Sequence, residues 1–289
     1  MRKTVARLRF VKMHGLGNDY VYVDCFSQPK PDGSALARAV SPRRTSVGSD
    51  GVILILPSFT ADCRMEMYNA DGSRGEMCGN GIRCLGKYVF ERGIARKNPL
   101  RVETDAGVKS LYFALNKNGA VEAVTVDMGE PVLDSRAIPV ATDHWPVVQY
   151  PLQIGNHRYE ITAVSMGNPH CVLFVEDVAT SPVTELGPIL ERHPFFPNRV
   201  NVEFAQVLNR NSLRMRVWER GSGETHACGT GACASVVAAV LQGLGDRQMQ
   251  VHLKGGVLDV EWREKDNRVY MTGPAEEVFE GELVWPPLE

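Results

Sequence analysis

The residues best suited to chemistry are two cysteines, each of which opens a Cys-Gly-x-Gly motif. Cys78 is followed by Gly79-Asn80-Gly81, and Cys228 by Gly229-Thr230-Gly231; a helix-like segment follows each motif. The first N–H groups of a helix lack internal partners and carry partial positive charge, so they can bind an anion such as an α-carboxylate. The same field should lower the pKa of a thiol at that position. The glycines should allow a tight turn and close approach of a ligand.

A pair of such thiols suits the inversion of a carbon centre. One group must remove a proton from one face while the other donates a proton to the opposite face, and two thiols across a domain interface could do so in both directions. A single Cys-Gly at a helix start is more often structural, but the pairing favours catalysis. A zinc site is disfavoured because Cys78/Cys84 and Cys228/Cys233 lack Cys-x-x-Cys spacing. A disulfide joining Cys78 and Cys228 would be an inactivated, oxidised form.

The two motifs belong to an internal repeat with an offset of roughly 150 residues. The coinciding pairs, in chain order, are Gly17-Asn18 with Gly167-Asn168, Met67-Tyr68 with Val217-Trp218, Cys78 with Cys228, and, one residue out of step, Val102 with Val251. Four matches in the same order indicate two copies of one fold.

Each copy reads as several strands and one clear helix. Runs rich in β-branched and aromatic residues predict strands at 21–24, 52–56, 123–128, 171–176, 202–207 and 213–217, and the N-terminus reads as a first strand. Apolar spacing predicts one helix ending at Gly93 and a second from about Gly231 to Gly243. The second is apolar nearly all round and should be buried. We therefore expect an α+β fold of two pseudo-symmetric domains, each a curled, mainly antiparallel sheet or barrel around a central helix.

The chain length favours two domains. The expected division is residues 1–130, joined by a C-terminal tail at 275–289 that returns as a strand, and residues 131–274. The linker should lie near Gly129-Glu130-Pro131.

Composition excludes several functional classes. The chain of 289 residues has a formal net charge of -2 with scattered positive residues, which gives no indication of nucleic-acid binding. Its basic N-terminus has no apolar stretch after it, so we expect neither a signal peptide nor a membrane span. Seven cysteines without regular spacing point to a reducing cytoplasm. Cys25, Cys63 and Cys171 lie in apolar surroundings and should be small core residues.

The ordered motifs resemble those of the diaminopimelate epimerase family and span nearly the whole chain. They are Lys12–Tyr20, Tyr68–Ser73, Met77–Cys84, Met166–His170, Asn201–Phe204 and Glu219–Thr225 followed by Ala227–Gly231. Some family members carry Gln directly after the Asp of Gly48-Ser49-Asp50, where this chain has Gly51, so any side-chain contact there is lost. Ser49 and Asp50 are interpreted as structural.

The resemblance implies interconversion of LL- and meso-2,6-diaminopimelate in lysine and cell-wall biosynthesis, without pyridoxal phosphate or metal, and often by a homodimer. It implies that Cys78 and Cys228 are the acid/base thiols. The helix-start residues that would hold the reacting α-carboxylate are Gly79, Asn80, Gly229 and Thr230. The residues that would bind the amino and carboxylate groups or tune the reacting centre are Asn18, Asn69, Asn168, His170, Asn201, Glu219 and Arg220.

Three other functions remain open from the sequence. A racemase of another amino acid, such as histidine or a proline derivative, would keep both thiols and change the distal residues. A related isomerase working through a carboxylate would need neither thiol. A binding module on the same fold would capture an amino acid without turnover. Arg220 with several asparagines suits a substrate that has a second amino-acid head group, which favours diaminopimelate.

Overall fold

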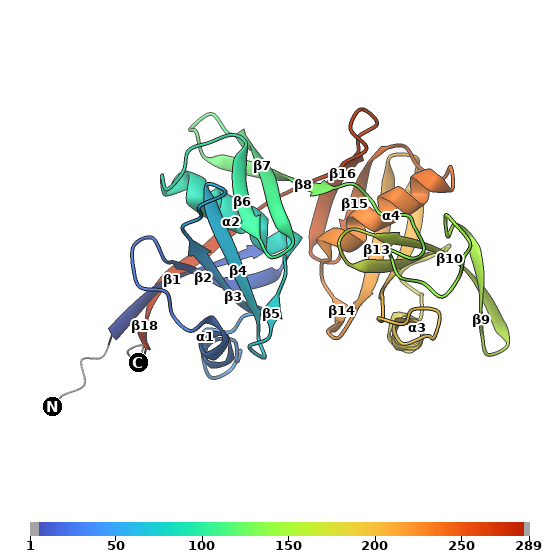
Figure 1. The fold of residues 1–289 in the computed structure, drawn as a ribbon, viewed down its shortest axis with the longest axis horizontal. Coiled ribbons are helices and arrows are strands. Elements are labelled where there is room, and N and C mark those ends of the chain that lie inside the picture. The colour runs from blue at the N-terminus through green and yellow to red at the C-terminus, as the bar shows by residue number, and fades with distance from the viewer. Residues whose placement is uncertain (1–5, 286–289) are drawn as a thin grey trace. The chain divides into compact units, whose positions relative to one another are not determined.

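The computed structural model describes residues 6–285. Their contacts divide the chain into two compact units: unit 1 extends to Val126 and resumes at Gly273, and unit 2 comprises Asp127–Thr272. The sequence placed these divisions at 130/131 and 274/275. Figure 1 shows the strands and helices of each unit.

Unit 1 contains two helices and a set of mostly antiparallel strands. The helices are α1 (Gly33–Val40) and α2 (Gly79–Glu91). The strands are β1 (Ala6–Gly15), β2 (Asn18–Asp24), β3 (Gly51–Leu56), β4 (Cys63–Asn69), β5 (Arg74–Gly75), β6 (Leu100–Thr104), β7 (Gly107–Leu115) and β18 (Glu276–Trp285). Strand β8 (Val121–Gly129) runs across the boundary between the units. The predicted C-terminal strand is confirmed, because β18 pairs antiparallel with β1. Residues 1–5 of the expected first strand lie outside the described part.

Unit 2 has the same plan. Its helices are α3 (Val183–Glu191) and α4 (Gly229–Leu241). Its strands are β9 (Tyr150–Ile154), β10 (His157–Ser165), β11 (Pro169–Phe174), β12 (Asn201–Asn209), β13 (Ser212–Glu219), β14 (Gly223–Thr225), β15 (Gln248–Leu253), β16 (Gly256–Trp262) and β17 (Val269–Gly273).

Strand register confirms the internal repeat. Tyr20 is opposite Gly51 in the parallel pair β2–β3, and His170 is opposite Asn201, 150 residues later, in the parallel pair β11–β12. The antiparallel pairs β3–β4 and β12–β13 match at the same offset, as do β4–β5 and β13–β14. The two units are therefore two copies of one strand arrangement.

The parallel pairs need crossover connections, and two helices that the sequence analysis missed provide them. Helix α1 lies between β2 and β3 in the chain, and α3 lies between β11 and β12. Helix α1 is short, but Asp32 caps it by accepting a hydrogen bond from the Ala35 N–H at 3.0 Å. Helix α3 contains Pro188, which obscures a helical pattern.

The central helix of each unit is buried, as predicted. In α4 every residue from Gly231 to Ala239 is buried, and the helix contacts β10, β11, β12, β13, β15 and β16. Helix α2 is buried from Gly79 to Gly86 and contacts β1, β2, β3 and β7. Gly93 and Gly243 follow these helices with φ of 72° and 71°, the left-handed conformation that commonly ends a helix. The strands that surround α2 and α4 thus hold the first turn of each helix in place.

A second apolar cluster in each unit lies under the crossover helix. In unit 1 it joins α1 to β1, β2 and β3, and in unit 2 it joins α3 to β10, β11 and β12. Cys63 and Cys171 are buried as expected, but Cys25 is only partly buried, because it follows the end of β2. No helix within residues 6–285 is both long enough and apolar enough to cross a membrane.

We expect the apolar face of α2 to dominate the stability of unit 1. Leu85 is fully buried, so Leu85→Ala should lower the free energy of unfolding by about 2–5 kcal/mol through lost burial and the cavity left behind. Leu115 on β7 is 46% exposed, and Leu115→Ala should change the free energy of unfolding far less. Urea unfolding of both variants measures the difference. Equal losses would contradict the central position of the helix.

Candidate active site

Each predicted thiol is the residue that caps a buried helix. Cys78 precedes α2 and Cys228 precedes α4, and both have an extended backbone with φ near -126° (-127° and -125°). The carbonyls of Cys78 and Cys228 accept the first helical hydrogen bonds, from Ile82 and Ala232. The residues that the sequence assigned to α-carboxylate binding therefore lie in the first turns of these helices.

The second glycine of each motif is required by packing. A Cβ on Gly81 would lie 2.6 Å from Ile53 Cδ1 of β3, and a Cβ on Gly231 would lie 2.7 Å from Glu203 Oε1 of β12. Both glycines lie within helices, so the expected role in a tight turn is wrong for them. Glycine at these positions lets the first helical turn lie directly on the neighbouring strand.

In unit 1 the Cys78 thiol belongs to a polar group around Asn18. The thiol donates to Asn18 Oδ1 at 3.2 Å, and Asn80 Nδ2 donates to the same oxygen at 3.4 Å. The N–H of Gly81 donates to Cys78 Sγ at 3.4 Å. The structure thus brings together Asn18, Cys78 and Asn80 as one half of the predicted site.

A carboxylate that the sequence analysis left as structural holds Asn18 in place. Asp50 Oδ2 accepts from Asn18 Nδ2 at 2.7 Å, and Asp50 Oδ1 accepts from Arg43 Nη2 at 2.6 Å. Asp50 directly precedes Gly51, whose added Cβ would lie 2.1 Å from the Tyr68 carbonyl oxygen. The close backbone approach explains why this chain has glycine there.

In unit 2 the Cys228 thiol lies beside Thr230, with Sγ and Oγ1 3.5 Å apart. Asn168 Nδ2 donates to Thr230 Oγ1 at 3.3 Å, and Asn168 Oδ1 faces His170 Nε2 at 3.0 Å. His170 is fully buried. Four predicted residues therefore form a continuous group, as Asn18, Cys78 and Asn80 do in unit 1.

The charge environment of Cys228 differs from the sequence expectation. Burial, followed by the nearby carboxylates of Glu219 and Glu203, raises the pKa of Cys228 well above its ordinary value. The predicted lowering of the pKa is therefore wrong, because desolvation outweighs the favourable helix end. Burial also raises the pKa of Glu219, although a hydrogen bond from Thr225 opposes that shift.

The remaining predicted residues lie at strand ends and have other partners. Asn69 ends β4, and its Nδ2 donates to Ser73 Oγ at 3.0 Å. Asn201 begins β12; its Nδ2 donates to the Pro169 carbonyl and its Oδ1 accepts from the Arg220 N–H, both at 2.9 Å. The Arg220 guanidinium is exposed and donates to the Asn198 carbonyl at 3.2 Å. In this state Asn201 fixes the backbone on both sides of β12.

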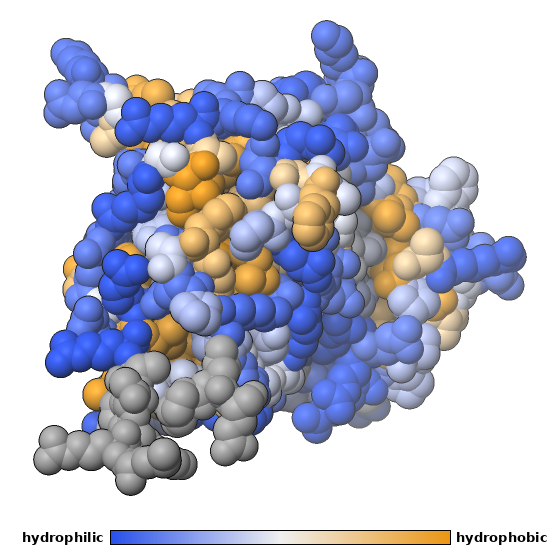
Figure 2. Space-filling view, turned by 60° about the vertical axis from the view of Figure 1, so that its left-hand side comes forward, coloured by the Kyte–Doolittle hydropathy of each residue, from blue (hydrophilic) through white to orange (hydrophobic). Residues whose placement is uncertain are grey.

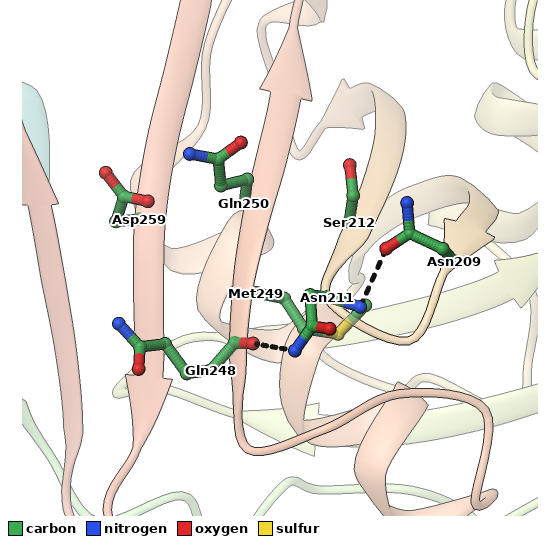
Figure 3. Close-up of a pocket in the computed structure, with 7 residues that line it drawn as sticks. All are labelled: Asn209, Asn211, Ser212, Gln248, Met249, Gln250 and Asp259. Carbon is green, nitrogen blue, oxygen red and sulfur yellow. Dashed lines mark hydrogen bonds between the residues drawn. The ribbon is translucent and has the colours of Figure 1, made fainter.

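A surface depression in unit 2 is a poor alternative site. It has a volume of about 490 Å³ and lies on strands β12, β13, β15 and β16. Figure 3 shows its lining, which consists of Asn209, Asn211, Ser212, Gln248, Met249, Gln250 and Asp259. Neutral amides dominate it, and it contains no thiol or imidazole.

Within residues 6–285, no three His, Cys, Asp or Glu side chains are grouped to hold a metal ion.

Comparison with known proteins identifies one family whose sequence profile matches segments in both units. The diaminopimelate epimerase family profile matches residues 10–133 and 162–278. The chain is 53% identical over 276 residues to the diaminopimelate epimerase of Acetivibrio thermocellus, covering 96% of this chain and 98% of that protein. It is 55% identical over 277 residues to the Moorella thermoacetica diaminopimelate epimerase, covering 96% and 99%.

Solved structures share the fold at low identity. A hydroxyproline epimerase from Agrobacterium vitis has a TM-score of 0.71 at 16% identity, covering 99% of this chain and 94% of that one. A probable proline racemase from Agrobacterium radiobacter has a TM-score of 0.70 at 16% identity, covering 98% and 94%. These similar structures support the predicted fold class. The family profile and the close relatives show to which family the chain belongs. The chain belongs to the diaminopimelate epimerase family.

Proposed function

We propose that this protein interconverts LL- and meso-diaminopimelate by moving a proton between Cys78, Cys228 and one α-carbon. The observation that carries the proposal is that each unit has a thiol at the same position, at the start of a buried helix. An asparagine side chain bonds to the thiol itself in unit 1 and to the neighbouring Thr230 in unit 2. The choice of diaminopimelate as substrate comes from close relatives that are diaminopimelate epimerases. The pathway implied by the resemblance, lysine and cell-wall precursor synthesis, consumes such a product.

The proton balance requires one thiolate and one thiol at the start of each turnover. The thiolate removes the α-proton and becomes a thiol, while the opposite thiol donates its proton to the other face of the carbon and becomes a thiolate. The next turnover in the reverse direction starts from that state. No organic cofactor or metal is needed for this balance.

The helix starts offset the poor acidity of the α-proton. An α-carboxylate bound by the first turns of α2 and α4, through Gly79, Asn80, Gly229 and Thr230, would meet the first N–H groups of the helices and their partial positive charge. Negative charge that develops on the substrate would be stabilised there. The Asn18 amide contacts the Cys78 thiol, and the Asn168 amide contacts Thr230 next to Cys228. The residues proposed for the other charged groups of the substrate are Asn69, His170, Asn201, Glu219 and Arg220.

The raised pKa of Cys228 favours the thiol over the thiolate at this position. Burial is the main cause, and the nearby carboxylates of Glu219 and Glu203 add to it. Binding of a positively charged substrate amine would oppose that effect. In this proposal Cys228 therefore enters its first turnover as the proton donor.

The decisive experiment is solvent exchange. Reduced protein is incubated with LL-diaminopimelate in deuterium oxide without added cofactor, and the α-proton signal and the stereoisomer ratio are followed. Deuterium incorporation with approach to an LL/meso mixture is the expected result. Exchange with another amino acid but not with diaminopimelate would overturn the substrate and keep the thiol chemistry, and binding without exchange would leave only an amino-acid-binding module.

Removal of either thiol should abolish epimerisation while substrate binding remains. We expect Cys78→Ser and Cys228→Ser each to lower kcat by at least about 100-fold, because each removes an acid/base group. Cys25→Ser is the matched control, since Cys25 is a partly buried thiol of unit 1 outside the polar group of Asn18, Cys78 and Asn80. Binding is measured by calorimetry. Wild-type turnover in either site variant would refute the two-thiol mechanism.

The influence of Glu219 on Cys228 has a testable sign. A carboxylate disfavours a nearby thiolate, so Glu219→Gln should lower the pKa of Cys228 and increase the thiolate fraction at fixed pH. The rate of iodoacetamide alkylation at Cys228, followed by peptide mass spectrometry at pH 8, should rise in this variant. The Cys78 peptide from the same sample is the internal control. A slower reaction at Cys228 would contradict the electrostatic assignment.

We further propose that the protein is cytoplasmic and forms a homodimer. All seven cysteines lie in the described part, and none of them is joined in a disulfide there, which supports a reducing compartment. Val278, Phe279 and Val284 are exposed apolar side chains on β18, which supports a contact surface there. Figure 2 shows patches of hydrophobic surface among hydrophilic side chains on the face that it presents.

Light scattering should give twice the mass of one chain. Val278→Glu should shift the mass towards a monomer, because a buried interface disfavours an unpaired charge. Phe59→Ser is the control, since Phe59 is fully exposed on the loop between β3 and β4. A monomeric wild-type protein would refute the dimer.

A further inference from the structure

Glu203 on β12 is a buried carboxylate that the proposed reaction does not use. Its side chain is fully buried, and Oε1 lies 2.7 Å from His170 Nδ1. Among the residues that the structure describes, Oε2 has no hydrogen-bond partner. Burial of a carboxylate costs free energy unless its charge and oxygens are paired, so this residue calls for an explanation.

A chain of hydrogen bonds connects this carboxylate to the Cys228 thiol. His170 Nε2 lies 3.0 Å from Asn168 Oδ1 and Nδ1 lies 2.7 Å from Glu203 Oε1, so the ring links the Asn168 amide to the carboxylate. Asn168 Nδ2 then donates to Thr230 Oγ1 at 3.3 Å, and Thr230 Oγ1 lies 3.5 Å from Cys228 Sγ. The orientation of each member depends on the one before it.

The first turn of α4 is shaped around the same carboxylate. A Cβ on Gly231 would lie 2.7 Å from Glu203 Oε1 and 3.3 Å from Cys228 Sγ. Glu203 therefore lies directly beneath the helix start that presents the thiol. Glu203 also contributes to the raised pKa values of Glu219 and Cys171, for which burial is the main cause.

Unit 1 shows that the fold itself does not need a carboxylate here. The position in unit 1 that is equivalent to Glu203, 150 residues earlier, is occupied by Ile53, which packs against Gly81 as Glu203 packs against Gly231. The position equivalent to His170 is occupied by Tyr20. From Cys78 the hydrogen bonds run instead through Asn18 and Asp50 to Arg43, which is exposed. The same scaffold is thus built with an apolar residue at this position.

We propose that Glu203 is a positioning residue for Cys228, acting through His170, Asn168 and Thr230. Its carboxylate holds Nδ1–H of the His170 ring, and the ring in turn fixes which end of the Asn168 amide faces Thr230. The Thr230 hydroxyl is thereby held beside the sulfur. Partners of this kind typically affect activity about 10- to 100-fold in metal sites, and we expect a similar effect here. The inference rests on the proposed role of Cys228 as an acid/base group.

Glu203→Gln tests the inference, because it keeps the shape and removes the charge. We expect kcat to fall about 10- to 100-fold while KM changes much less, since the orientation of the thiol and not the substrate contacts is altered. Asp127→Asn is the matched control: Asp127 is a buried carboxylate of unit 2, paired with Arg268 at 2.8 Å, and should retain wild-type kcat. Wild-type kcat in Glu203→Gln would overturn the proposal.

A spectroscopic readout separates positioning from a general structural effect. A long-range proton–nitrogen spectrum of the wild-type protein, with His170 assigned through His170→Asn, should show a protonated Nδ1 with a downfield hydrogen-bonded proton. That proton should move upfield in Glu203→Gln, because a neutral amide oxygen is a weaker acceptor than a carboxylate, and should keep its position in Asp127→Asn. An unprotonated Nδ1 in the wild-type protein would overturn the proposal without any variant.

Two further variants keep the outcomes distinct. If Glu203→Gln does not fold, Glu203→Ile, which copies the residue of unit 1, takes its place with the same expected loss of kcat. If Cys228→Ser is fully active, the two-thiol mechanism fails. If Cys228→Ser is inactive and Glu203→Gln has wild-type kcat and an unchanged His170 signal, only the role of Glu203 fails.

Discussion

The constraint on which the structure depends is that a helix start must lie directly on a strand. In both units the first turn of the buried helix packs against the strand that follows the crossover helix, and a glycine makes that approach possible. Because the helix is enclosed by strands, its axis and its first residue are fixed by burial. A cysteine at the cap position is then held in place beside the first N–H groups of the helix.

That arrangement places opposing effects on the thiol. The helix end favours a thiolate, whereas burial disfavours one, and in unit 2 two carboxylates add to the effect of burial. The chain resolves the conflict differently in its two halves. Unit 1 connects its thiol to an asparagine that an aspartate and a surface arginine hold, and unit 2 connects its thiol to an imidazole held by a buried glutamate. Symmetry of the backbone thus coexists with asymmetry of the charges.

The sequence predicted the elements whose patterns are local and strong. Helix α4 is apolar on every side, and only a buried position satisfies such a segment. The repeat was visible because its glycine and cysteine motifs recur at one offset. Helices α1 and α3 were missed because they are short and one contains proline, although the Asp32 cap was a usable signal.

The electrostatic details could not be predicted, because they depend on which residues the fold brings together. The raised pKa of Cys228 comes from burial and from carboxylates on two strands. Glu203 lies in a motif that the sequence analysis recognised, yet only strand register shows that it replaces Ile53 of the other copy. Asp50 likewise looked structural, and its contact with Asn18 links that role to the thiol.

The pairing of β18 with β1 has a consequence for synthesis on the ribosome. Unit 1 needs residues from both ends of the chain, because β1 lies between β2 and the C-terminal strand β18. Unit 2 is continuous in sequence and is complete before β18 has been made. Translation proceeds from the N-terminus, so unit 2 has all of its residues before unit 1 gains β18. In the nascent chain, the edge of β1 that pairs with β18 has no such partner until β18 emerges.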